Sequence, residues 1–548
     1  MNEANRMTIR MAGRNENLCS INEKKNHNYK KGNPMKNKFF KIGKMSGLFF
    51  ILGLSLGSLI NLYAQNEAMV DLDSTHQIIR GFGAANIILW RPDMTDYEIE
   101  TAFGTDDGQL GFTILRLMIE PDKNRWGLNV ATAKKAYDLG VTIMASPWYA
   151  PSEMVETANG VSRVRYDMYD EYAAHLDSFS TFMSSNGVPI YAVSIQNEPD
   201  YGDWTRWTSD EMLTFMKESA SAIGTRVMAP ESFQFRHSFS DPMLNDSAAC
   251  ANLDILGGHI YGAGIGAYPL AESKGKELWM TEHLSGENST PDDWYWAFEV
   301  AKEINNVMDA GMSAYVWWYC VRYYGPISDG TYMRKSEVTK KGYIMSQFAR
   351  FIRPGYYKLE STFFPQRNVY STAYKDSATS KVVIVAINTA SQAKDQTFVF
   401  QNGHIQMFTP YVTSDLKDCH QEADILVSND NLNVTLDAES ITTFVSSGEI
   451  TSVPDNASSG PASFVLSQNY PNPFNPRTRI NFTIPEKSFV SLKVYNTLGE
   501  EMDELAGKEY PAGEHSVTFD ATYLADGVYF YTLETGDYIN TRKMIVIK

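Results

Sequence analysis

The sequence predicts an α/β fold: a (β/α)8 TIM barrel, an attached β-sandwich side domain and a separate C-terminal β-sandwich domain. Between residues 78 and 319, short and almost continuously apolar runs alternate with longer amphipathic segments. Such runs suit parallel strands that are buried on both faces. Several of them end in polar or aromatic residues, as expected when strand ends share a pocket at the carboxyl-terminal mouth of a barrel.

Eight apolar runs supply the predicted barrel strands, in a domain that we assign to residues 65–345. They are IIRGFGAA (78–85), TILRLMIE (113–120), VTIMASPW (141–148), IYAVSIQNEP (190–199), RVMAPES (226–232), LDILGGHIY (253–261), LWMTEH (278–283) and SAYVWWY (313–319). Between them, segments 168–185 and 294–310 place apolar residues three and four positions apart, as crossover helices do. A doubly wound open sheet is the alternative, but the strand-end residues favour the barrel.

The pattern changes after RFIRPGYY (350–357). Alternating strands then predict an antiparallel β-sandwich side domain over residues 346–447. Its strand segments are VYSTAYK, KVVIVAINT, QTFVFQN, MFTPYVT and ITTFVSS. We expect AMVDLD (68–73), which precedes the first barrel strand, to join this domain.

The two ends of the chain differ from the centre. Residues 1–64 predict a signal peptide with an N-terminal extension, because lysines precede the apolar stretch GLFFILGLSLGSLINLYA and cleavage can follow Ala64. A membrane anchor of similar length is the alternative. Residues 448–463, GEITSVPDNASSGPAS, are polar and rich in Gly, Pro and Ser, as in a linker. Residues 464–548 then predict a second small β-domain.

Charge and cysteine content argue against several kinds of partner and against a metal site. The formal net charge is −17, and because residues 1–64 carry 11 Lys and Arg against three Glu, a chain starting at Gln65 would carry −25. This acidity argues against nucleic acid and anionic membranes as partners. Beyond residue 64 three cysteines remain, an odd number. No Cys or His grouping has metal-ligand spacing, so we predict no metal site, and we expect a monomer.

Two predicted barrel strands end in a glutamate. Glu198 lies in VSIQNEPDY after the fourth run, and Glu282 lies in LWMTEH at the seventh. Strand ends converge in a barrel, so these residues can face each other although they are distant in sequence. Two facing carboxyl groups can cleave a glycosidic bond, one as acid and the other as nucleophile or base. The alternative for each glutamate is a salt-bridged or capped strand end.

Aromatic side chains surround the same strand ends. They are Trp148 in SPWYAPSEM, His259 and Tyr261 in GHIYG, and Trp317 and Trp318 in YVWWY. Sugars stack their apolar C–H faces on such rings and need a few placed hydrogen-bond partners. Each tryptophan alone could equally belong to the core. Together with two carboxylates, the set favours sugar chemistry.

These motifs carry a family resemblance. GFGAAN, SPWYAPSEM, VSIQNEPDY, GHIY, LWMTEH and AYVWWYCVRYYGP, followed by RFIRPGYY and ITTFV, resemble glycoside hydrolase family 30, most closely its glucuronoxylan endo-xylanases, over roughly residues 69–447. The resemblance implies Glu198 as general acid/base, Glu282 as nucleophile and Asn197 as a ligand of the sugar 2-hydroxyl. It also implies a retaining mechanism, with carboxyl groups about 5 to 5.5 Å apart.

The stretch WWYCVRYYGPISDG bears on the substrate. In the similar glucuronoxylanases, an arginine and a tyrosine two residues later hold the methylglucuronic acid branch of xylan, and Arg322 and Tyr324 match these positions. A guanidinium can bind a carboxylate through two hydrogen bonds. Pairing of Arg322 with Asp329 is the alternative. Val321 stands where a second arginine is usual, which bears on how strictly the branch is required.

The C-terminal segment also resembles a known domain. SQNYPNPFNPRTRINFTIP and the strands after it resemble the C-terminal sorting domain of type IX secretion. The resemblance implies the secretion machinery as a partner and a secreted or cell-surface location. A spacer or carbohydrate-contacting β-module is the alternative.

Three functions remain open on the sequence. The first is a secreted retaining endo-β-1,4-xylanase that cleaves glucuronoxylan and recognises its acidic branch. The second is a family 30 hydrolase acting on unbranched xylan, a β-1,6-glucan or a glucosyl conjugate. The third is a non-catalytic glycan-binding surface protein. The proposed hydrolysis needs no cofactor.

Overall fold

The computed structural model describes residues 66–447 and 464–546, apart from residues 203, 263, 264, 288, 291, 470, 471, 473, 486, 498 and 537. The described residues form two compact units, 66–447 and 464–546. The predicted signal peptide (1–64) and linker (448–463) lie outside the described residues and stay predictions. No helix in the described part of the chain is long and apolar enough to cross a membrane.

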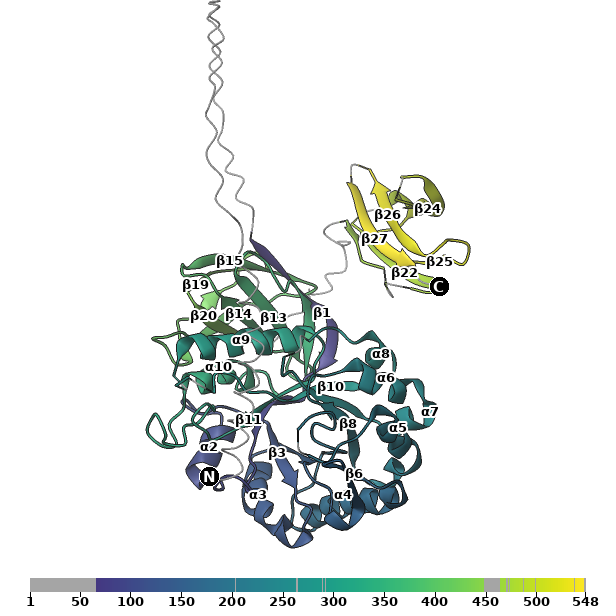
Figure 1. Cartoon of the computed structure of the whole chain (residues 1–548). Helices are drawn as coiled ribbons and strands as arrows, with labels where there is room; N and C mark the ends of the chain where they lie inside the picture. Colours follow the sequence, from purple (N-terminus) through teal and green to yellow (C-terminus); the bar gives the residue numbers. More distant parts are fainter. Residues whose placement is uncertain are drawn as a thin grey trace, which may run out of the picture. The chain divides into compact units, whose positions relative to one another are not determined.

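Eight parallel strands close into a barrel in the order β10-β11-β2-β3-β4-β7-β8-β9 (Figure 1). This confirms the predicted (β/α)8 class, and each of the eight apolar runs overlaps one barrel strand. The strands are β2 Gly81–Ala85, β3 Ile114–Ile119, β4 Thr142–Pro147, β7 Ala192–Ser194, β8 Arg226–Ser232, β9 Ile255–His259, β10 Glu277–Glu282 and β11 Ala314–Tyr319.

Helices follow the barrel strands and surround them (Figure 1). The α-helices are α2 Asp96–Phe103, α3 Val130–Asp138, α4 Tyr169–Ser185, α5 Ser209–Glu218, α6 His237–Asn245, α7 Ser247–Ala251, α8 Pro269–Ser273, α9 Trp294–Asp309 and α10 Lys340–Ala349. Short 3-10 helices lie at η1 Lys123–Asn129, η2 Ser152–Met154, η3 Tyr166–Met168 and η4 Ala220–Ala222. The apolar spacing that predicted helices over 168–185 and 294–310 is confirmed by α4 and α9. A hairpin of β5 Val155–Ala158 and β6 Val161–Val164 extends the loop after β4.

The barrel interior is filled by side chains from its own strands. Its buried residues are Ile114, Met144, Ala192, Met228, Ile255, Trp279, Ala314 and Val316. Packing also explains a glycine in the motif GFGAA: a Cβ at Gly83 would lie 1.9 Å from the carbonyl oxygen of Ile114, so only glycine lets β2 and β3 approach this closely. The barrel is therefore a packed core, and a catalytic site is expected at the carboxyl-terminal ends of its strands.

The side domain is β-rich, as predicted, and its strands form one continuous ten-stranded sheet in the order β17-β16-β20-β14-β13-β12-β1-β15-β19, with β18 paired to β16. The strands are β1 Glu67–Ile78, β12 Tyr356–Ser361, β13 Val369–Asp376, β14 Val382–Asn388, β15 Lys394–Gln401, β16 Met407–Thr413, β17 His420–Gln421, β18 Ile425–Leu426, β19 Asn431–Leu436 and β20 Ser440–Ser447. The segment before the barrel enters this sheet as β1, antiparallel to β12 and parallel to β15.

Helices α9 and α10 join the barrel to this sheet. α9 contacts β13, and α10 contacts β16 and β20. Buried hydrogen bonds cross the contact: Thr372 Oγ1 donates to Oδ1 of Asn305 at 2.7 Å, and Thr443 Oγ1 donates to the carbonyl of Gln347 at 2.7 Å. The predicted division between residues 345 and 346 falls inside α10. This helix contacts the barrel strand β2 as well as β16 and β20 of the side-domain sheet, so it belongs to both parts.

The C-terminal unit is a two-sheet β-sandwich. One sheet has the order β21-β22-β25 and the other β24-β23-β26-β27. The strands are β21 Val465–Leu466, β22 Arg477–Ile484, β23 Ser488–Tyr495, β24 Glu501–Tyr510, β25 Gly513–Asp520, β26 Gly527–Thr535 and β27 Tyr538–Val546. Apolar residues of both sheets, among them Ile480, Leu492 and Tyr531, share one core, so this unit has the core of an independent domain.

Candidate active site

The turn after β7 delivers Glu198 to the barrel mouth. Gln196 braces this turn, since its Nε2 donates to the carbonyl oxygens of Pro147 and Trp148 at 3.1 and 2.9 Å. Glu198 has a φ of 45°, and its N–H donates to the carbonyl of Glu231 at 3.0 Å. Left-handed backbone at a non-glycine residue costs of order 1 kcal/mol and concentrates at functional sites. The turn therefore holds the carboxylate in a conformation that the local sequence alone disfavours.

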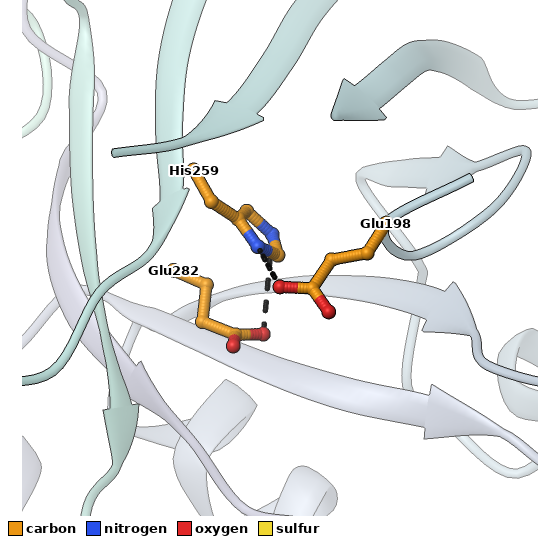
Figure 2. A group of neighbouring side chains, drawn as sticks. All are labelled: Glu198, His259 and Glu282. Atoms are coloured by element: carbon orange, nitrogen blue, oxygen red, sulfur yellow. Dashed lines mark hydrogen bonds and ion pairs between the residues drawn. The ribbon is translucent and has the colours of Figure 1, made fainter. Parts of the chain in front are cut away.

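Glu198, His259 and Glu282 meet at this mouth (Figure 2). His259 Nδ1 lies 3.0 Å from Oε1 of Glu198, and His259 Nε2 lies 3.9 Å from Oε2 of Glu282. One carboxylate oxygen of each glutamate and a ring nitrogen of His259 all lie within 4.8 Å of one another. All three side chains are buried. The strand-end glutamates of β7 and β10 thus share one site.

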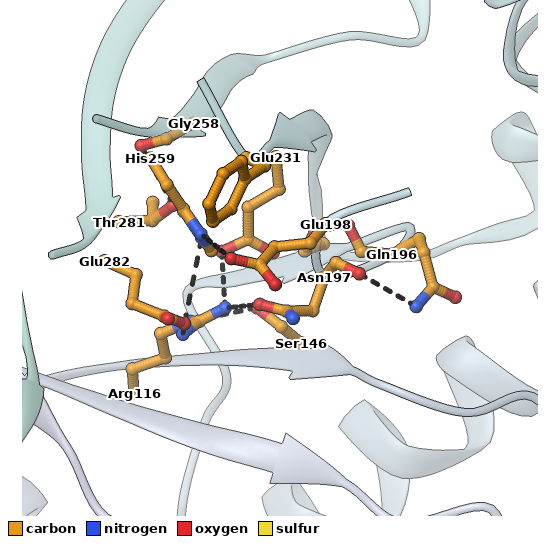
Figure 3. Close-up of polar contacts among 12 residues, drawn as sticks. Arg116, Ser146, Gln196, Asn197, Glu198, Glu231, Gly258, His259, Thr281 and Glu282 are labelled. Atoms are coloured by element: carbon orange, nitrogen blue, oxygen red, sulfur yellow. Dashed lines mark hydrogen bonds and ion pairs between the residues drawn. The ribbon is translucent and has the colours of Figure 1, made fainter. Parts of the chain in front are cut away.

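A buried arginine lies beneath the two glutamates (Figure 3). Arg116 of β3 donates from Nη1 to Oε2 of Glu282 and from Nη2 to Oδ1 of Asn197, both at 2.6 Å. Its Nη2 also lies 2.9 Å from Oε1 of Glu231, at the end of β8. Arg116 and Glu231 are fully buried, so this is an ion-paired cluster inside the protein.

Sequence reasoning missed both Arg116 and Glu231. Their signal was available, because each is a charged residue within a run predicted to be a barrel strand, TILRLMIE for Arg116 and RVMAPES for Glu231. A buried charge in a parallel strand must be paired.

The cluster sets the protonation of its members. Burial, together with the charge of Glu282, raises the pKa of Glu198. Burial alone would lower the pKa of His259, but the carboxylates around it raise that pKa to about 9. Burial would raise the pKa of Glu231, yet Arg116 and His259 outweigh it and lower the value to about 2. With Glu198 protonated, two cations face two carboxylates and the five-group cluster is electroneutral.

Hydrogen-bond donors hold the glutamates from the sides. Trp204 Nε1 donates to Oε2 of Glu198 at 2.9 Å, and Tyr261 donates from its hydroxyl to Oε1 of Glu282 at 3.0 Å. Asn197 keeps its Nδ2 buried and without a hydrogen-bond partner among the described residues. Each carboxylate is thus fixed in orientation, and one amide donor is left for a ligand.

Tryptophans form one wall of the mouth. Trp90 packs against Trp148, Trp204 and Trp318 with ring centroids 5.6, 5.8 and 6.3 Å apart. The Arg116 guanidinium lies 4.6 Å from the ring centroid of Trp148. Trp148 and Trp318 are buried, while Trp90 is half-buried. Trp90 and Trp204, which sequence reasoning did not single out, complete the wall.

Trp317 packs on the outer side of β11, because side chains alternate along a strand and its neighbour Val316 lies in the barrel interior. It is fully buried, and Nζ of Lys341 lies 5.6 Å from its ring centroid. This is the alternative that the sequence left open for each tryptophan.

Arg322 and Tyr324 lie together in the loop after β11. The Arg322 guanidinium lies 4.7 Å from the ring centroid of Tyr323 and 5.7 Å from that of Tyr324. Arg322 Nη1 also lies 3.4 Å from Oδ2 of Asp329, so the alternative pairing considered from the sequence is present, as a long contact. Within the described residues, no hydrogen bond or ion pair joins Arg322 or Tyr324 to either catalytic candidate.

The same three residues, Glu198, His259 and Glu282, are the metal-ligand candidates within the described part of the chain. A pKa of about 9 leaves His259 protonated at neutral pH, and an imidazolium has no lone pair for a metal ion. Arg116 adds a second cation beside the group. The arrangement suits proton transfer and covalent attack better than metal coordination.

Comparisons with known proteins match this geometry. The chain is 44% identical over 412 residues to glucuronoxylanase XynC of Bacillus subtilis (strain 168), covering 72% of this chain and 96% of that protein. It is similar to the structure of a GH30 endoxylanase from Clostridium papyrosolvens C71, with 42% identity, a TM-score of 0.64, and 70% of this chain and 100% of that chain covered. The glycoside hydrolase family 30 subfamily 8 xylanase Xyn30A from Clostridium acetobutylicum matches with 35% identity and the same TM-score and coverage.

The C-terminal unit has its own match. Residues 468–548 match the secretion system C-terminal sorting domain, which confirms the predicted sorting domain and marks the protein for export to the cell surface or beyond. Over the rest of the chain, the identity to a curated glucuronoxylanase, the barrel with its β-rich side domain and the facing strand-end glutamates agree with one another. The chain belongs to glycoside hydrolase family 30.

Proposed function

We propose that the protein is a secreted, monomeric, retaining endo-β-1,4-xylanase that cleaves glucuronoxylan and recognises its (methyl)glucuronic acid branch. The carrying observation is the approach of Glu198 and Glu282, whose nearest carboxylate oxygens lie within 4.8 Å. Retaining glycosidases hold their carboxyl groups about 5 to 5.5 Å apart, too close for a water molecule between a base and the sugar.

In the first step Glu282 attacks the anomeric carbon while Glu198 donates its proton to the glycosidic oxygen. The bond from the anomeric carbon to that oxygen breaks, and a bond to a Glu282 oxygen forms. Glu198 is suited to be the acid because burial and the Glu282 charge raise its pKa. Arg116 and Tyr261 hold the Glu282 carboxylate for attack.

In the second step Glu198 acts as base. It takes a proton from water, the water oxygen bonds to the anomeric carbon, and Glu282 leaves as a carboxylate. Two displacements retain the anomeric configuration. Asn197 supports both steps, because its unpartnered Nδ2 can donate to the sugar 2-hydroxyl while Arg116 fixes its Oδ1.

Glu198→Gln should lower kcat/KM on glucuronoxylan by about 10² to 10⁴, the usual contribution of general acid catalysis. The raised pKa keeps Glu198 protonated to higher pH, so wild-type activity should fall as pH rises through that value, and the variant should lack this alkaline limb. A 2,4-dinitrophenyl β-xylobioside needs little protonation of its leaving group. Single-turnover cleavage of this xylobioside by Glu198→Gln should therefore be reduced far less than hydrolysis of glucuronoxylan. An equal loss on both substrates would contradict the assignment of Glu198 as the general acid.

Recognition of the branch is tested by the products. Each product of wild-type digestion of glucuronoxylan, sized by mass spectrometry, should carry one acidic branch at a fixed position near its reducing end. Arabinoxylan without uronic acid branches should be cut poorly. Arg322→Ala should lower kcat/KM on glucuronoxylan about 10- to 100-fold and spare arabinoxylan, since a bidentate ion pair is lost only with the acidic substrate. An equal effect on both polymers would remove the branch assignment.

A second candidate is a family 30 hydrolase of another specificity. Its supporting observation is the contact of Arg322 with Asp329, which engages the arginine within the protein. Equal cutting of branched and unbranched xylan by the wild type would favour it. A non-catalytic glycan-binding role is disfavoured, because it gives no reason to bury two glutamates around one histidine.

A further inference from the structure

A second arginine lies beside Arg322, although it is distant in sequence. Arg91, in the loop between β2 and α2, donates from Nη2 to Oδ2 of Asp329 at 2.7 Å. The same Oδ2 lies 3.4 Å from Nη1 of Arg322. Arg91 thus makes the short contact and Arg322 the long one. Asp329 and Arg322 have side chains only 8% and 9% exposed and that of Arg91 is 24% exposed, so solvent screens the contact of Asp329 with Arg322 little.

Asp329 is held in place from its other oxygen. Oδ1 accepts from the N–H of Thr331 at 3.0 Å and from its hydroxyl at 2.6 Å. Both arginines therefore contact the same oxygen, Oδ2, and the contact of Arg91 is the shorter one. Two cations and one carboxylate leave this group, Arg91, Arg322 and Asp329, with one net positive charge.

Three buried polar atoms in and around this positively charged group have no hydrogen-bond partner in the described part of the chain. Nε of Arg322, Nε of Arg91 and the hydroxyl of Tyr319 are buried without hydrogen-bond partners among the described residues. Burial raises the pKa of Tyr319, both guanidinium groups oppose this, and the charge of Glu282 adds to it. Tyr319 is the last residue of β11, and β11 pairs with β10, which ends at Glu282, so Tyr319 and the proposed nucleophile lie at the same mouth of the barrel.

Arg91 is positioned by the active-site wall. Its neighbour Trp90 packs against Trp148 and Trp318, so the backbone at Arg91 is tied to the tryptophans of the mouth. At the position next to Arg322 in sequence stands Val321. The second guanidinium near Arg322 is thus supplied by a different loop.

We propose that Arg91 is a specificity-determining positioning residue: by neutralising Asp329 it keeps the charge of Arg322 available for the carboxylate of an acidic xylan branch. Arg91 itself does not contact the branch. Without it, Asp329 pairs with Arg322 and the net charge of the group falls to zero. This inference rests on the proposed recognition of the acidic branch.

The test compares two forms of one polymer, glucuronoxylan and glucuronoxylan whose uronic carboxylates have been reduced to alcohols. The full-length wild type and the variants Arg91→Gln, Asp329→Asn and Arg91→Gln/Asp329→Asn are assayed for kcat/KM on both. Arg334→Gln is the matched control, because Arg334 lies in the same loop as Asp329, is 85% exposed and pairs only with Glu337 among the described residues. Asn at 329 keeps an oxygen for the turn with Thr331.

Arg91→Gln should lower kcat/KM on the acidic polymer about tenfold, close to the loss of one charge-assisted contact, with a change of no more than about twofold on the reduced polymer. Asp329→Asn should retain at least wild-type preference for the acidic polymer. The double variant should recover most of the preference, because the net charge of one is restored. Arg334→Gln should behave as wild type.

A purely structural role predicts the opposite pattern. If Arg91 only anchored its loop, the double variant would be no better than Arg91→Gln, and both polymers would suffer equally. Either result overturns the inference, as does an unchanged preference in Arg91→Gln. A wild type that cuts both polymers equally would instead overturn the proposed function. If the wild type prefers the acidic polymer and Arg322→Ala loses this preference, the proposed function holds, and the result for Arg91→Gln then tests the Arg91 inference alone.

Discussion

Glu282→Gln is expected to lower kcat on glucuronoxylan by about 10⁴-fold or more while the protein stays folded. The loss is large because no other group can form the covalent glycosyl intermediate, and residues that act as a unit fail together. Glutamine keeps the shape and can still contact Tyr261, so the loss reports chemistry and not packing. Reducing-sugar release under single-turnover conditions, with the circular dichroism spectrum and melting temperature, measures both.

The matched control is Glu277→Gln. Glu277 lies at the other end of the same strand, β10, and accepts hydrogen bonds from Arg80 and Arg226. Its replacement should lower stability and leave kcat within a few-fold. Adding azide to Glu282→Gly with an activated β-xylobioside should yield the α-configured azide, because azide replaces the missing nucleophile on the same face. Wild-type products with inverted configuration would end the retaining assignment.

The sequence predicts the barrel and its two glutamates well because both depend on local patterns. Eight apolar runs of strand length set the number of strands, and Glu198 and Glu282 each close such a run. Strand ends of a barrel converge by geometry, so facing glutamates follow from fold class alone. His259 and Tyr261 follow in the same way, at the end of β9 and just after it.

Other parts depend on contacts between distant segments, and the local sequence pattern does not identify the partner. The parallel pairing of β1 with β15 joins residues about 330 positions apart, and the pairing of Arg91 with Asp329 spans 238. Arg116 is a charged residue in a strand, and only the fold shows that Glu231 and Glu282 lie beside it. The sequence of a single strand cannot show which distant residue pairs with its buried charge.

Charge balance links these missed residues to the chemistry. Arg116 and His259 supply two positive charges, and Glu231 and Glu282 supply two negative ones, so ionising Glu198 would add an uncompensated buried charge. Burial and the charge of Glu282 therefore raise the pKa of Glu198 and favour its protonated form, which the first step of the proposed mechanism uses. Glu231 never contacts the reacting atoms in this scheme, yet its charge holds Arg116 in place.

Arg116→Met is expected to destabilise the protein by about 3 to 5 kcal/mol and to abolish measurable hydrolysis. The guanidinium contacts Glu282, Glu231, Asn197 and Ser146 in a site with no solvent exposure. Its loss leaves two buried carboxylates, Glu231 and Glu282, with His259 as their one remaining cation among the described residues, and breaking a buried ion pair costs this much. The pKa of Glu231, now lowered to about 2 by Arg116 and His259, should rise in the variant. Urea unfolding followed by tryptophan fluorescence measures the stability.

The double variant Arg116→Met/Glu231→Met separates folding from catalysis. Replacing a buried ion pair with apolar side chains of similar size is often neutral or stabilising, so the double variant should regain most of the lost stability. It should remain inactive, because Glu282 and Asn197 still lack the donor that orients them. Recovery of activity together with stability would mean that Arg116 serves only the fold. A loss below about 1 kcal/mol in Arg116→Met would mean that the cluster is not the buried, ion-paired unit on which the assignment of the proton to Glu198 depends.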